Sequence, residues 1–435
     1  MNAIRITGMV ITALFAACYA YQVYYMYVVW RGMLRNKVMS SKRQTAGNET
    51  ANRVIYYHDF AVLICARNEE KVIADLIRSI RQQTYPAGHV HVFVMADNCT
   101  DNTAMVARRH GAKVYRRDNH IQVGKGYALE ALFNAIKRDH LDGFDGYFVF
   151  DADNLMAPDY IEKMNKALCN GNEIVTCYRN SKNYGDNWIS AGNALFFMRE
   201  SRYMNQARYL SGASCAVSGT GFMLSRAVVE EMDGWHYHML TEDIEFSMDQ
   251  IAKGRRIAYC DEAEIFDEQP DSFMQSWRQR LRWTKGNIAV YLKYWHELLK
   301  GALHGSFACY DMAMSVIPAY FLSIASFVCA LALGMGKLMA GEVTGAMLPL
   351  VKALLGSYCL FFVMGTVTTV TEWHHIRAMS WQKIVYMFSF PIFMMTYLPV
   401  SIASVFAKSE WKPITHNATA DRITLYGNGV KRPAA

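Results

Sequence analysis

The most constraining feature of this sequence is the position of its long apolar runs, which lie at the two ends of a more polar middle. Residues 6–30 are apolar apart from Gln22 and small polar residues, and residues 307–335, 347–371 and 384–406 form a second apolar block. A helix needs about 20 apolar residues to cross the hydrocarbon core of a bilayer. Each run is long enough, so we predict a multi-pass membrane protein with a soluble middle domain.

The composition agrees with this division. Hydrophobic residues make up 52% of the 435 residues and charged residues only 19%, whereas an average soluble domain has about 25% charged residues. Such a content of apolar and aromatic side chains excludes intrinsic disorder. The ten cysteines form no CxxC pair, which argues against a structural zinc site and fits buried thiols in a reducing compartment.

Charge around the first apolar run predicts its orientation. Only Arg5 precedes the run, whereas Arg31, Arg35 and Lys37 follow it, and basic flanks favour the cytoplasmic side. We therefore predict an N-terminal transmembrane helix over residues 1–34 in the inner (plasma) membrane, followed by a cytoplasmic domain. A cleaved signal peptide would have its basic residues before the apolar run. The net charge of +7 is attributed to cytoplasmic loops and an anionic partner, and no nucleic acid is expected as a partner.

The C-terminal membrane region, residues 307–407, contains one ambiguous segment. Residues 384–406 include Pro391 and Pro399, which are expected to interrupt a helix. If both the stretch 372–383, which is rich in basic and aromatic residues, and the basic tail are cytoplasmic, this segment must be re-entrant. A full crossing with an external tail is the alternative, and the charge distribution favours the cytoplasmic tail.

Residues 55–270 alternate between short apolar segments and amphipathic segments. The first kind predicts strands and the second helices: strands at 60–66, 91–96, 112–115 and 147–150, and helices at 69–83, 101–110 and 124–138. This alternation is typical of βαβ units with a mostly parallel sheet, a Rossmann-like α/β domain. Ligands of such domains bind at the carboxyl ends of the strands, and acidic residues of this chain follow several of the predicted strands.

The pair Asp151 and Asp153 directly follows the strand predicted at 147–150. Two such carboxylates supply the oxygen ligands that Mg²⁺ or Mn²⁺ prefers, and substrate phosphates can complete the coordination. The tripeptide is common, so a solvated turn is the alternative interpretation. Asn68-Glu69 and Asp97 follow two other predicted strands.

A second acidic pair, Glu242-Asp243, comes after Thr241 at the start of a predicted helix. A carboxylate in this position can act as a general base. Thr241 can also cap the helix, whose first turn favours acidic residues, and the two roles are compatible. Lys125, which is flanked by two glycines, begins another predicted helix and is suited to binding an anion.

Gln279, Arg280, Arg282 and Trp283 occur together in a predicted amphipathic, interfacial segment, residues 271–306. Guanidinium groups bind phosphate oxygens in a fork, and a tryptophan ring stacks on a sugar. A basic amphipathic helix on the inner leaflet would also satisfy the pattern. Both interpretations remain open for these residues taken alone.

Together, in this order and at this spacing, the motifs resemble those of the membrane-embedded, processive family 2 glycosyltransferases. This group includes the cellulose, hyaluronan, chitin and poly-N-acetylglucosamine synthases. The resemblance covers about residues 55–300 and implies a GT-A type fold with flanking transmembrane helices. The motifs that carry it are Ala66-Arg67-Asn68-Glu69, Ala96-Asp97-Asn98, Asp151-Ala152-Asp153, Ser218-Gly219-Thr220-Gly221, Thr241-Glu242-Asp243 and the QxxRW motif at Gln279–Trp283.

The resemblance implies an inverting transfer from a UDP-sugar, UDP-glucose or UDP-N-acetylglucosamine, to a growing β-linked glycan that is then translocated. It implies that Asp151 and Asp153 bind the diphosphate through Mg²⁺ or Mn²⁺ and that Asp243, beside Glu242, is the general base. The remaining residues would contact donor or acceptor: Asn68, Glu69, Asp97, Lys125, Gly219, Thr220, Gln279, Arg280, Arg282 and Trp283.

The basic tail, residues 408–435, contains Trp411 and Thr415, which resemble segments that close over the nucleotide in some of these synthases. We therefore treat the tail as a candidate gating and substrate-binding segment. With few membrane helices, a channel would be narrow, shared with a second copy or an export partner, or absent. The alternative function is a non-processive transfer of one sugar from a UDP-sugar to a membrane lipid.

Overall fold

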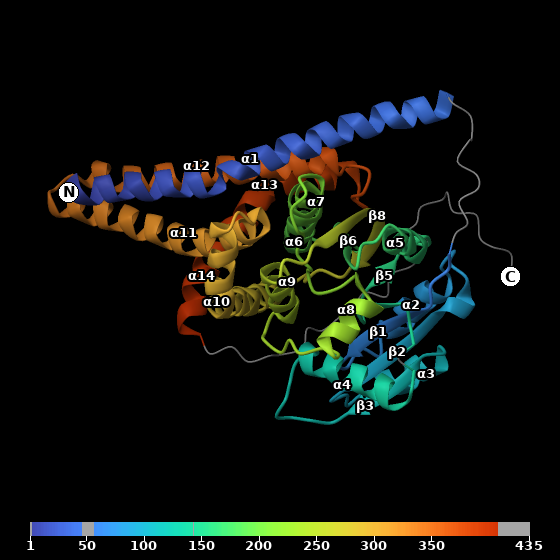
Figure 1. The fold of residues 1–435 in the computed structure, drawn as a ribbon. Coiled ribbons are helices and arrows are strands. Elements are labelled where there is room, and N and C mark those ends of the chain that lie inside the picture. The colour runs from blue at the N-terminus through green and yellow to red at the C-terminus, as the bar shows by residue number, and fades with distance from the viewer. Residues whose placement is uncertain (1, 46–55, 142, 408–435) are drawn as a thin grey trace.

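The computed structural model describes residues 2–45, 56–141 and 143–407 (Figure 1). An N-terminal helix, α1 (Asn2–Thr45), precedes a domain built on one sheet. The strands are β1 (Phe60–Ala66), β2 (Val90–Asp97), β3 (Lys113–Arg117), β4 (Gly146–Asp151), β5 (Leu155–Met156), β6 (Ile174–Ser181), β7 (Phe222–Ser225) and β8 (Ile257–Asp267).

Helices connect and cover these strands. Those of the sheet domain are α2 (Ile73–Arg81), η1 (Ala87–His89), α3 (Thr103–Arg109), α4 (Lys125–Arg138), α5 (Tyr160–Cys169), α6 (Trp188–Arg199), η2 (Glu200–Asn205), α7 (Gln206–Leu210), α8 (Arg226–Met232) and α9 (Glu242–Ala252). The C-terminal helices are α10 (Phe273–Leu303), α11 (Phe307–Met339), α12 (Val343–Thr371), α13 (Ser380–Met395) and α14 (Tyr397–Phe406).

The sheet has the strand order β3-β2-β1-β4-β7-β6-β8-β5. The strands β1 to β4 are parallel, as the alternation predicts, whereas β7 pairs antiparallel with both β4 and β6. Because β8 runs parallel to β6, the strands β6 and β8 point in the same direction as β1 and β4. The carboxyl ends of six strands, β1 to β4, β6 and β8, therefore lie at one edge of the sheet.

Side chains of the central strands alternate between two cores. On β1, Ala61 and Leu63 pack with α4 and α6, whereas Phe60, Val62 and Ile64 pack with α2 and α5 on the other face. All five side chains are fully buried. Burial of both faces explains why β1 reads as a continuous apolar run and not as an alternating one.

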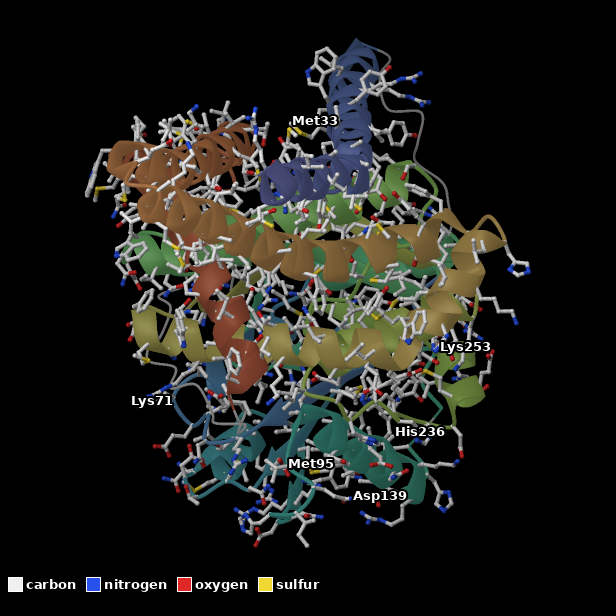
Figure 2. The ribbon with its side chains drawn as sticks, turned by 90° about the vertical axis from the view of Figure 1, so that its left-hand side faces the viewer. Met33, Lys71, Met95, Asp139, His236 and Lys253 are labelled. Atoms are coloured by element: carbon white, nitrogen blue, oxygen red, sulfur yellow. The ribbon has the colours of Figure 1, made fainter. Side chains whose placement is uncertain are left out.

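Within the described residues, four helical segments are long and apolar enough to cross a membrane: Ile4–Arg35, Phe321–Met339, Gly345–Thr371 and Ser380–Phe406. The helix α11 packs against both α1 and α12, and the three project away from the sheet domain (Figure 1). In Figure 2, Met33 on α1 and Asp139 in the sheet domain lie at opposite ends of the molecule. The first turns of α11, unlike the rest of this helix, lie beside the sheet domain, where Cys309 and Met312 are buried against α9 and α10.

The last apolar segment bends at a different place from the one predicted. The helix α13 continues through Pro391, and the break falls at Thr396, between α13 and α14. Pro399 lies in the first turn of α14, where the missing N–H costs no intrahelical bond. Its ring would clash with a carbonyl four residues earlier, which explains why α13 ends at Met395. The interruption predicted at Pro391 is therefore absent.

The apolar C-terminal helices are closely packed on the sheet domain at α6. A Cβ on Gly192 of α6 would lie 2.4 Å from Phe393 Cγ of α13. Such a distance is far below van der Waals contact, so α13 can approach α6 this closely only because residue 192 has no side chain. This contact holds the end of α13 beside the carboxyl edge of the sheet. The segment predicted as several interfacial helices, residues 271–306, is largely the single helix α10.

Candidate active site

Two asparagines shape the loops after β1 and β2. Asn68 and Asn98 have φ values of 59° and 52°, a backbone region that asparagine tolerates better than most residues. The Oδ1 atom of Asn68 accepts a hydrogen bond from the Thr100 N–H at 2.8 Å. Asn68 therefore joins the two loops, and it does not line the cavity described below, whereas its neighbour Glu69 does.

Asp97 is buried at the end of β2 and also lines the cavity. Its Oδ1 atom accepts a hydrogen bond from Arg117 Nη1 at 2.6 Å, and Arg117 Nη2 donates to the Gln122 carbonyl at 2.6 Å. Arg117, which the sequence motifs do not include, therefore balances the charge of Asp97. A ligand at this end of the cavity meets a paired carboxylate.

Lys125 links three elements at the carboxyl edge of the sheet. Its ammonium group donates to the Asp151 carboxylate and, at 2.7 Å, to the Gly219 carbonyl. Burial alone would lower the pKa of this lysine, but the charges of Asp151 and Glu242 outweigh burial and raise its pKa to about 12. Lys125 is therefore positively charged at neutral pH and holds α4, β4 and the Ser218–Gly221 loop together.

Gly219 lies between the two acidic pairs. Its φ is +77°, and a Cβ at this position would lie 3.7 Å from Asp243 Oδ2 and 3.9 Å from Asp151 Oδ2. Carboxylates from β4 and from α9 therefore face each other across this residue. The structure thus brings together two motifs that the sequence places far apart.

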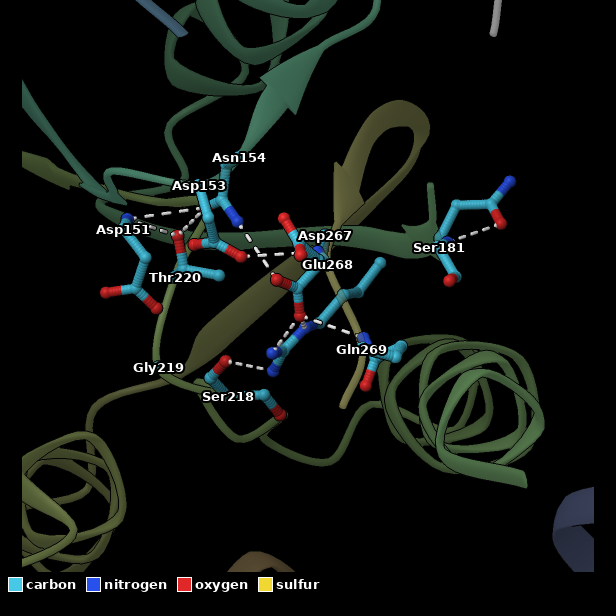
Figure 3. A network of polar contacts seen from close by, with 12 residues as sticks. Asp151, Asp153, Asn154, Ser181, Ser218, Gly219, Thr220, Asp267, Glu268 and Gln269 are labelled. Atoms are coloured by element: carbon cyan, nitrogen blue, oxygen red, sulfur yellow. Dashed lines mark hydrogen bonds and ion pairs between the residues drawn. The ribbon is translucent and has the colours of Figure 1, made fainter. Parts of the chain in front are cut away.

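Thr220 supports the end of β4 and does not line the cavity. Its Oγ1 atom accepts a hydrogen bond from the Asp151 N–H at 2.9 Å and donates to Asn154 Oδ1 (Figure 3). Since Asp151 is held at its backbone in this way, its side chain remains directed at Lys125 and Gly219. Thr220 is therefore placed to position Asp151, which differs from the expected contact with substrate.

Asp153 belongs to a network that the sequence motifs do not reveal (Figure 3). Its Oδ2 atom accepts a hydrogen bond from the Glu268 N–H at 3.2 Å, and Asp267 accepts one from Arg179 Nε at 2.8 Å. Burial and the charge of Asp153 raise the pKa of Asp267 to about 6, against the opposing effect of Arg179. Asp267 ends β8 as Asp151 ends β4, but the acidic residues within β8 hide this strand from an apolar-run pattern.

Of the acidic pair at the start of α9, Glu242 is buried and Asp243 is partly exposed. Burial and repulsion from Asp243 raise the pKa of Glu242 to about 7, and Lys125 and Arg282 act in the opposite direction. Burial also raises the pKa of Asp243, which is opposed first by its hydrogen bond from the Ile244 N–H. The pair therefore resists carrying two negative charges at neutral pH. The Thr241 side chain makes no capping hydrogen bond, so its predicted capping role is not observed.

Three members of the QxxRW motif, Gln279, Arg282 and Trp283, line the same cavity. Arg282 Nη1 donates to the Leu240 carbonyl at 3.1 Å, which anchors α10 beside the start of α9. The Trp283 ring meets the Phe197 ring edge to face, with centroids 5.6 Å apart. The indole and the guanidinium therefore flank the approach to Asp243.

Arg280 is not placed with the other predicted site residues. It is fully buried, and its Nη1 atom donates to Thr396 Oγ1 at 2.6 Å, at the break between α13 and α14. Its guanidinium carbon lies 4.5 Å from the ring centroid of Phe393 and 4.9 Å from that of Tyr397. A helix C-terminus and two aromatic faces both stabilise a cation. Arg280 thus contacts the apolar helices α13 and α14, whereas the sequence predicted a contact with the diphosphate.

One cavity of about 1150 Å³ connects these residues with the membrane helices. At one end it is lined by polar residues from the sheet domain: Glu69, Asp97, Lys125, Asp151, Asp153, Gly219, Glu242, Asp243, Gln279, Arg282 and Trp283. At the other end its wall contains apolar side chains of α1, α11 and α12: Phe15, Val23, Met26, Phe327, Ala330, Leu354 and Phe361. Trp411 and Thr415 lie outside the described residues.

Among the residues that the structure describes, no group of three or more His, Cys, Asp or Glu side chains is arranged to hold a metal ion. Asp151 and Asp153 offer two carboxylates in the cavity wall. Mg²⁺ and Mn²⁺ accept such oxygen ligands, with phosphate oxygens and water in the other positions. The two residues therefore fit a cation that arrives with a nucleoside diphosphate.

A family model described as "Glycosyltransferase like family 2" matches residues 58–286, which is more than half of the chain. The chain therefore belongs to this family and is a glycosyltransferase, as the motifs imply. Its fold class is confirmed as a GT-A type α/β domain flanked by apolar helices.

Curated relatives include enzymes named for a glycolipid product and enzymes named for a polysaccharide product. The chain is 26% identical over 275 residues to the β-monoglucosyldiacylglycerol synthase of Nostoc sp., covering 61% of this chain and 56% of the relative. It is 20% identical over 307 residues to the poly-β-1,6-N-acetyl-D-glucosamine synthase of Staphylococcus epidermidis, covering 69% of each. The chain thus spans only a little over half the length of the first of these relatives.

Among solved structures, the fold is similar to the mannosyltransferase PcManGT from Pyrobaculum calidifontis, which was solved in complex with GDP-Man and Mn²⁺. The TM-score is 0.55 at 16% sequence identity, and the likeness covers 92% of this chain and 98% of that one. The similarity of fold therefore extends beyond residues 58–286 into the apolar helices.

Proposed function

We propose that this protein transfers a single sugar from a nucleotide sugar to the headgroup of a membrane lipid. The observation that carries the proposal is the continuous cavity from Asp243 to the apolar wall formed by α1, α11 and α12. A lipid that enters between these helices would keep its chains in apolar surroundings while its headgroup reaches the catalytic carboxylates. The similarity to an enzyme named for a monoglucosyldiacylglycerol product supports this choice of acceptor.

The chemistry follows from the two acidic pairs. An acceptor hydroxyl oxygen attacks the anomeric carbon, its proton passes to Asp243, and the bond to the nucleoside diphosphate breaks with its electron pair on the phosphate oxygen. Arg282 and Lys125 supply positive charge near the departing diphosphate, where such charge stabilises the transition state. Attack from the face opposite the leaving group inverts the anomeric configuration, so an α-linked donor gives a β-linked product.

A divalent cation bound by Asp151 and Asp153 would neutralise charge on the diphosphate. Asp151 also receives the Lys125 ammonium group, so its carboxylate connects the diphosphate position with the helix α4. Glu69 and Asp97 line the part of the cavity that would receive the nucleoside. We propose UDP as the nucleotide and a multi-pass arrangement with the sheet domain on the cytoplasmic side, in line with the charge asymmetry of α1.

Processive synthesis of a β-linked glycan is the second candidate. The specific observation in its favour is the QxxRW motif, of which Gln279, Arg282 and Trp283 line the cavity. The 69% mutual coverage with a poly-N-acetylglucosamine synthase supports the same candidate. A polymerase requires a path for its product, and the cavity between α1, α11 and α12 would then hold the glycan and not a lipid.

The product separates the two candidates. The full chain in nanodiscs of mixed lipids is incubated with radiolabelled UDP-glucose, UDP-N-acetylglucosamine and GDP-mannose, each with Mg²⁺ or Mn²⁺. Label that partitions into organic solvent and migrates as one glycolipid is the expected result. Water-soluble material of high molecular weight would refute the lipid proposal in favour of the polymerase. Asp243→Asn is the control, since label in either product must disappear with the base.

A further inference from the structure

A polar contact that the proposed catalytic steps do not use lies in the wall of the same cavity. Gln22 is the only long polar side chain in the apolar run 6–30, and it lies within the candidate span Ile4–Arg35. Its Oε1 atom accepts a hydrogen bond from Arg199 Nη2 at 3.2 Å, and both residues line the cavity. Polar residues inside membrane spans are costly and usually face a partner or a ligand path.

Arg199 is the last residue of α6 and is followed by the π-helical turn η2, a feature that is frequent at functional sites. Among the described residues its guanidinium donates only to Gln22, and no carboxylate lies within 4.0 Å of its nitrogens. Burial lowers the pKa of Arg199, because the charged form loses its solvation. A guanidinium that is partly removed from solvent and has no counter-ion is costly unless an anion reaches it.

The charged neighbours of Arg199 are engaged elsewhere. Glu200 Oε1 accepts a hydrogen bond from Ser218 Oγ at 2.6 Å, and Arg208 Nε donates to Asp311 Oδ2 at 2.5 Å. Arg280, which also lacks a carboxylate partner, is instead stabilised by Thr396 and two aromatic rings and lies outside the cavity. Arg199 has no such rings, and its free donors face the cavity.

We propose that Arg199, held by Gln22, binds the phosphate group of an anionic membrane lipid whose hydroxyl-bearing headgroup is the sugar acceptor. This inference rests on the proposed function and specifies its acceptor. A guanidinium binds phosphate oxygens through two parallel hydrogen bonds. The apolar side chains of α1, α11 and α12 line the same cavity and would cover the chains of a lipid. A free phosphate would leave this apolar part of the cavity unfilled.

Arg199 and the proposed base Asp243 line the same cavity. Glu200 follows Arg199 and bonds to Ser218, whose neighbour Gly219 faces both Asp243 and Asp151. A phosphate at Arg199 and a hydroxyl at Asp243 would therefore share one cavity wall. A neutral diacylglycerol has no group for Arg199 and would leave its charge unpaired.

The test compares binding of two short-chain lipids to the full chain in detergent micelles by native mass spectrometry. One is phosphatidylglycerol, which has a phosphate and hydroxyl groups, and the other is diacylglycerol with the same acyl chains. We expect phosphatidylglycerol to bind about tenfold more tightly, because its phosphate adds charge-assisted hydrogen bonds. Arg199→Gln should remove that preference and Arg199→Lys should retain part of it. Arg138→Gln, which removes an exposed arginine on α4, is the matched charge control.

Nucleotide affinity and thermal melting establish that each variant is folded. Equal binding of the two lipids by the parent, or a preference that survives in Arg199→Gln, would overturn the inference. Inorganic phosphate that binds as tightly as the phospholipid would also overturn it. Failure of the proposed function gives a different pattern: the lipid preference depends on Arg199, but no lipid receives sugar in the nanodisc assay. Transfer to diacylglycerol in preference to phosphatidylglycerol would overturn the inference and leave the proposed function standing.

Discussion

Arg202 and Glu372 form a two-pronged ion pair that joins the sheet domain to the end of α12. Arg202 Nε lies 2.8 Å from Glu372 Oε1, and Arg202 Nη2 lies 3.0 Å from Glu372 Oε2. The Tyr178 hydroxyl donates to the same carboxylate at 2.8 Å, and Arg202 also pairs with Asp261. Side chains from β6, from the π-helical turn η2 and from the C-terminus of the apolar helix α12 thus meet in one network.

Removal of the arginine should be strongly destabilising. Arg202→Met leaves the Glu372 carboxylate, with only 1% of its side chain exposed, without its counter-ion. The expected loss is about 3–5 kcal/mol in the free energy of unfolding, measured as a lowered thermal midpoint in nanodiscs. Lys253→Met, at the exposed Lys253–Asp249 pair, is the control and should cost less than about 1 kcal/mol.

A double variant tests the cause of this loss. Arg202→Met combined with Glu372→Gln removes the unpaired charge while the amide oxygen can still accept from Tyr178. We expect it to be more stable than Arg202→Met alone. If Arg202→Met costs no more than Lys253→Met, the ion pair contributes nothing to the docking of α12.

The sequence predicts the first half of the sheet well because each strand there is followed by its own helix and ends in polar residues. Asp97 and Asp151 were expected at one edge for this reason, and the parallel pairing of β1 with β2 and β4 places them there. Arg179 and Asp267 were not expected. Their strands, β6 and β8, lie beyond the antiparallel strand β7 in the sheet. A contact between residues so distant in sequence leaves no local pattern.

The QxxRW motif shows a second limit of sequence reasoning. Successive residues on a helix are separated by about 100°, so adjacent members of one motif can face different surroundings. Arg282 faces the cavity and Arg280 faces α13 and α14. Which face of α10 meets substrate depends on where α13 breaks, and that break is set by Pro399 and not by the motif.

Loss of the proposed base should abolish turnover without loss of nucleotide binding. Asp243→Asn keeps the shape of the side chain but cannot accept the acceptor proton. We expect turnover of the radiolabelled donor to fall by about 10²–10⁴-fold. Affinity for UDP, measured by calorimetry, should be unchanged or slightly higher, since one negative charge near Asp151 is removed. Asp233→Asn, an exposed aspartate paired with Lys137, is the matched control; similar turnover in both variants would remove Asp243 from its role.

The proposed metal site can be tested through nucleotide affinity alone. In the parent, Mn²⁺ should increase the affinity for UDP, because a cation bridges the carboxylates and the diphosphate. Asp153→Asn should reduce that gain about tenfold, whereas affinity in the presence of a chelator should change little. Asp153 is preferred to Asp151 for this test because Asp151 also holds Lys125. An unchanged gain from Mn²⁺ in Asp153→Asn would show that the cation binds elsewhere.

The pH dependence of the reaction should show which of the two carboxylates, Glu242 or Asp243, is the base. A general base acts only when it is ionised, so kcat/KM falls as the pH drops through its pKa. Burial raises the pKa of Asp243, which places the acid limb above the usual pKa of an aspartate. Glu242, whose pKa is raised to about 7, is already protonated at lower pH and then exerts no repulsion on Asp243. Glu242→Gln should therefore leave the acid limb near its position in the parent.

An acid limb that stays in place in Glu242→Gln identifies Asp243 as the base. The measurement is the pH profile of kcat/KM for sugar transfer, in the parent, in Glu242→Gln and in Glu230→Gln, where an exposed glutamate on α8 is changed. Glu230→Gln should leave the limb in place, since Glu230 does not line the cavity. Loss of the acid limb and of most of the turnover in Glu242→Gln would contradict this assignment. Glu242 would then accept the proton of the acceptor hydroxyl, and Asp243 would position Glu242.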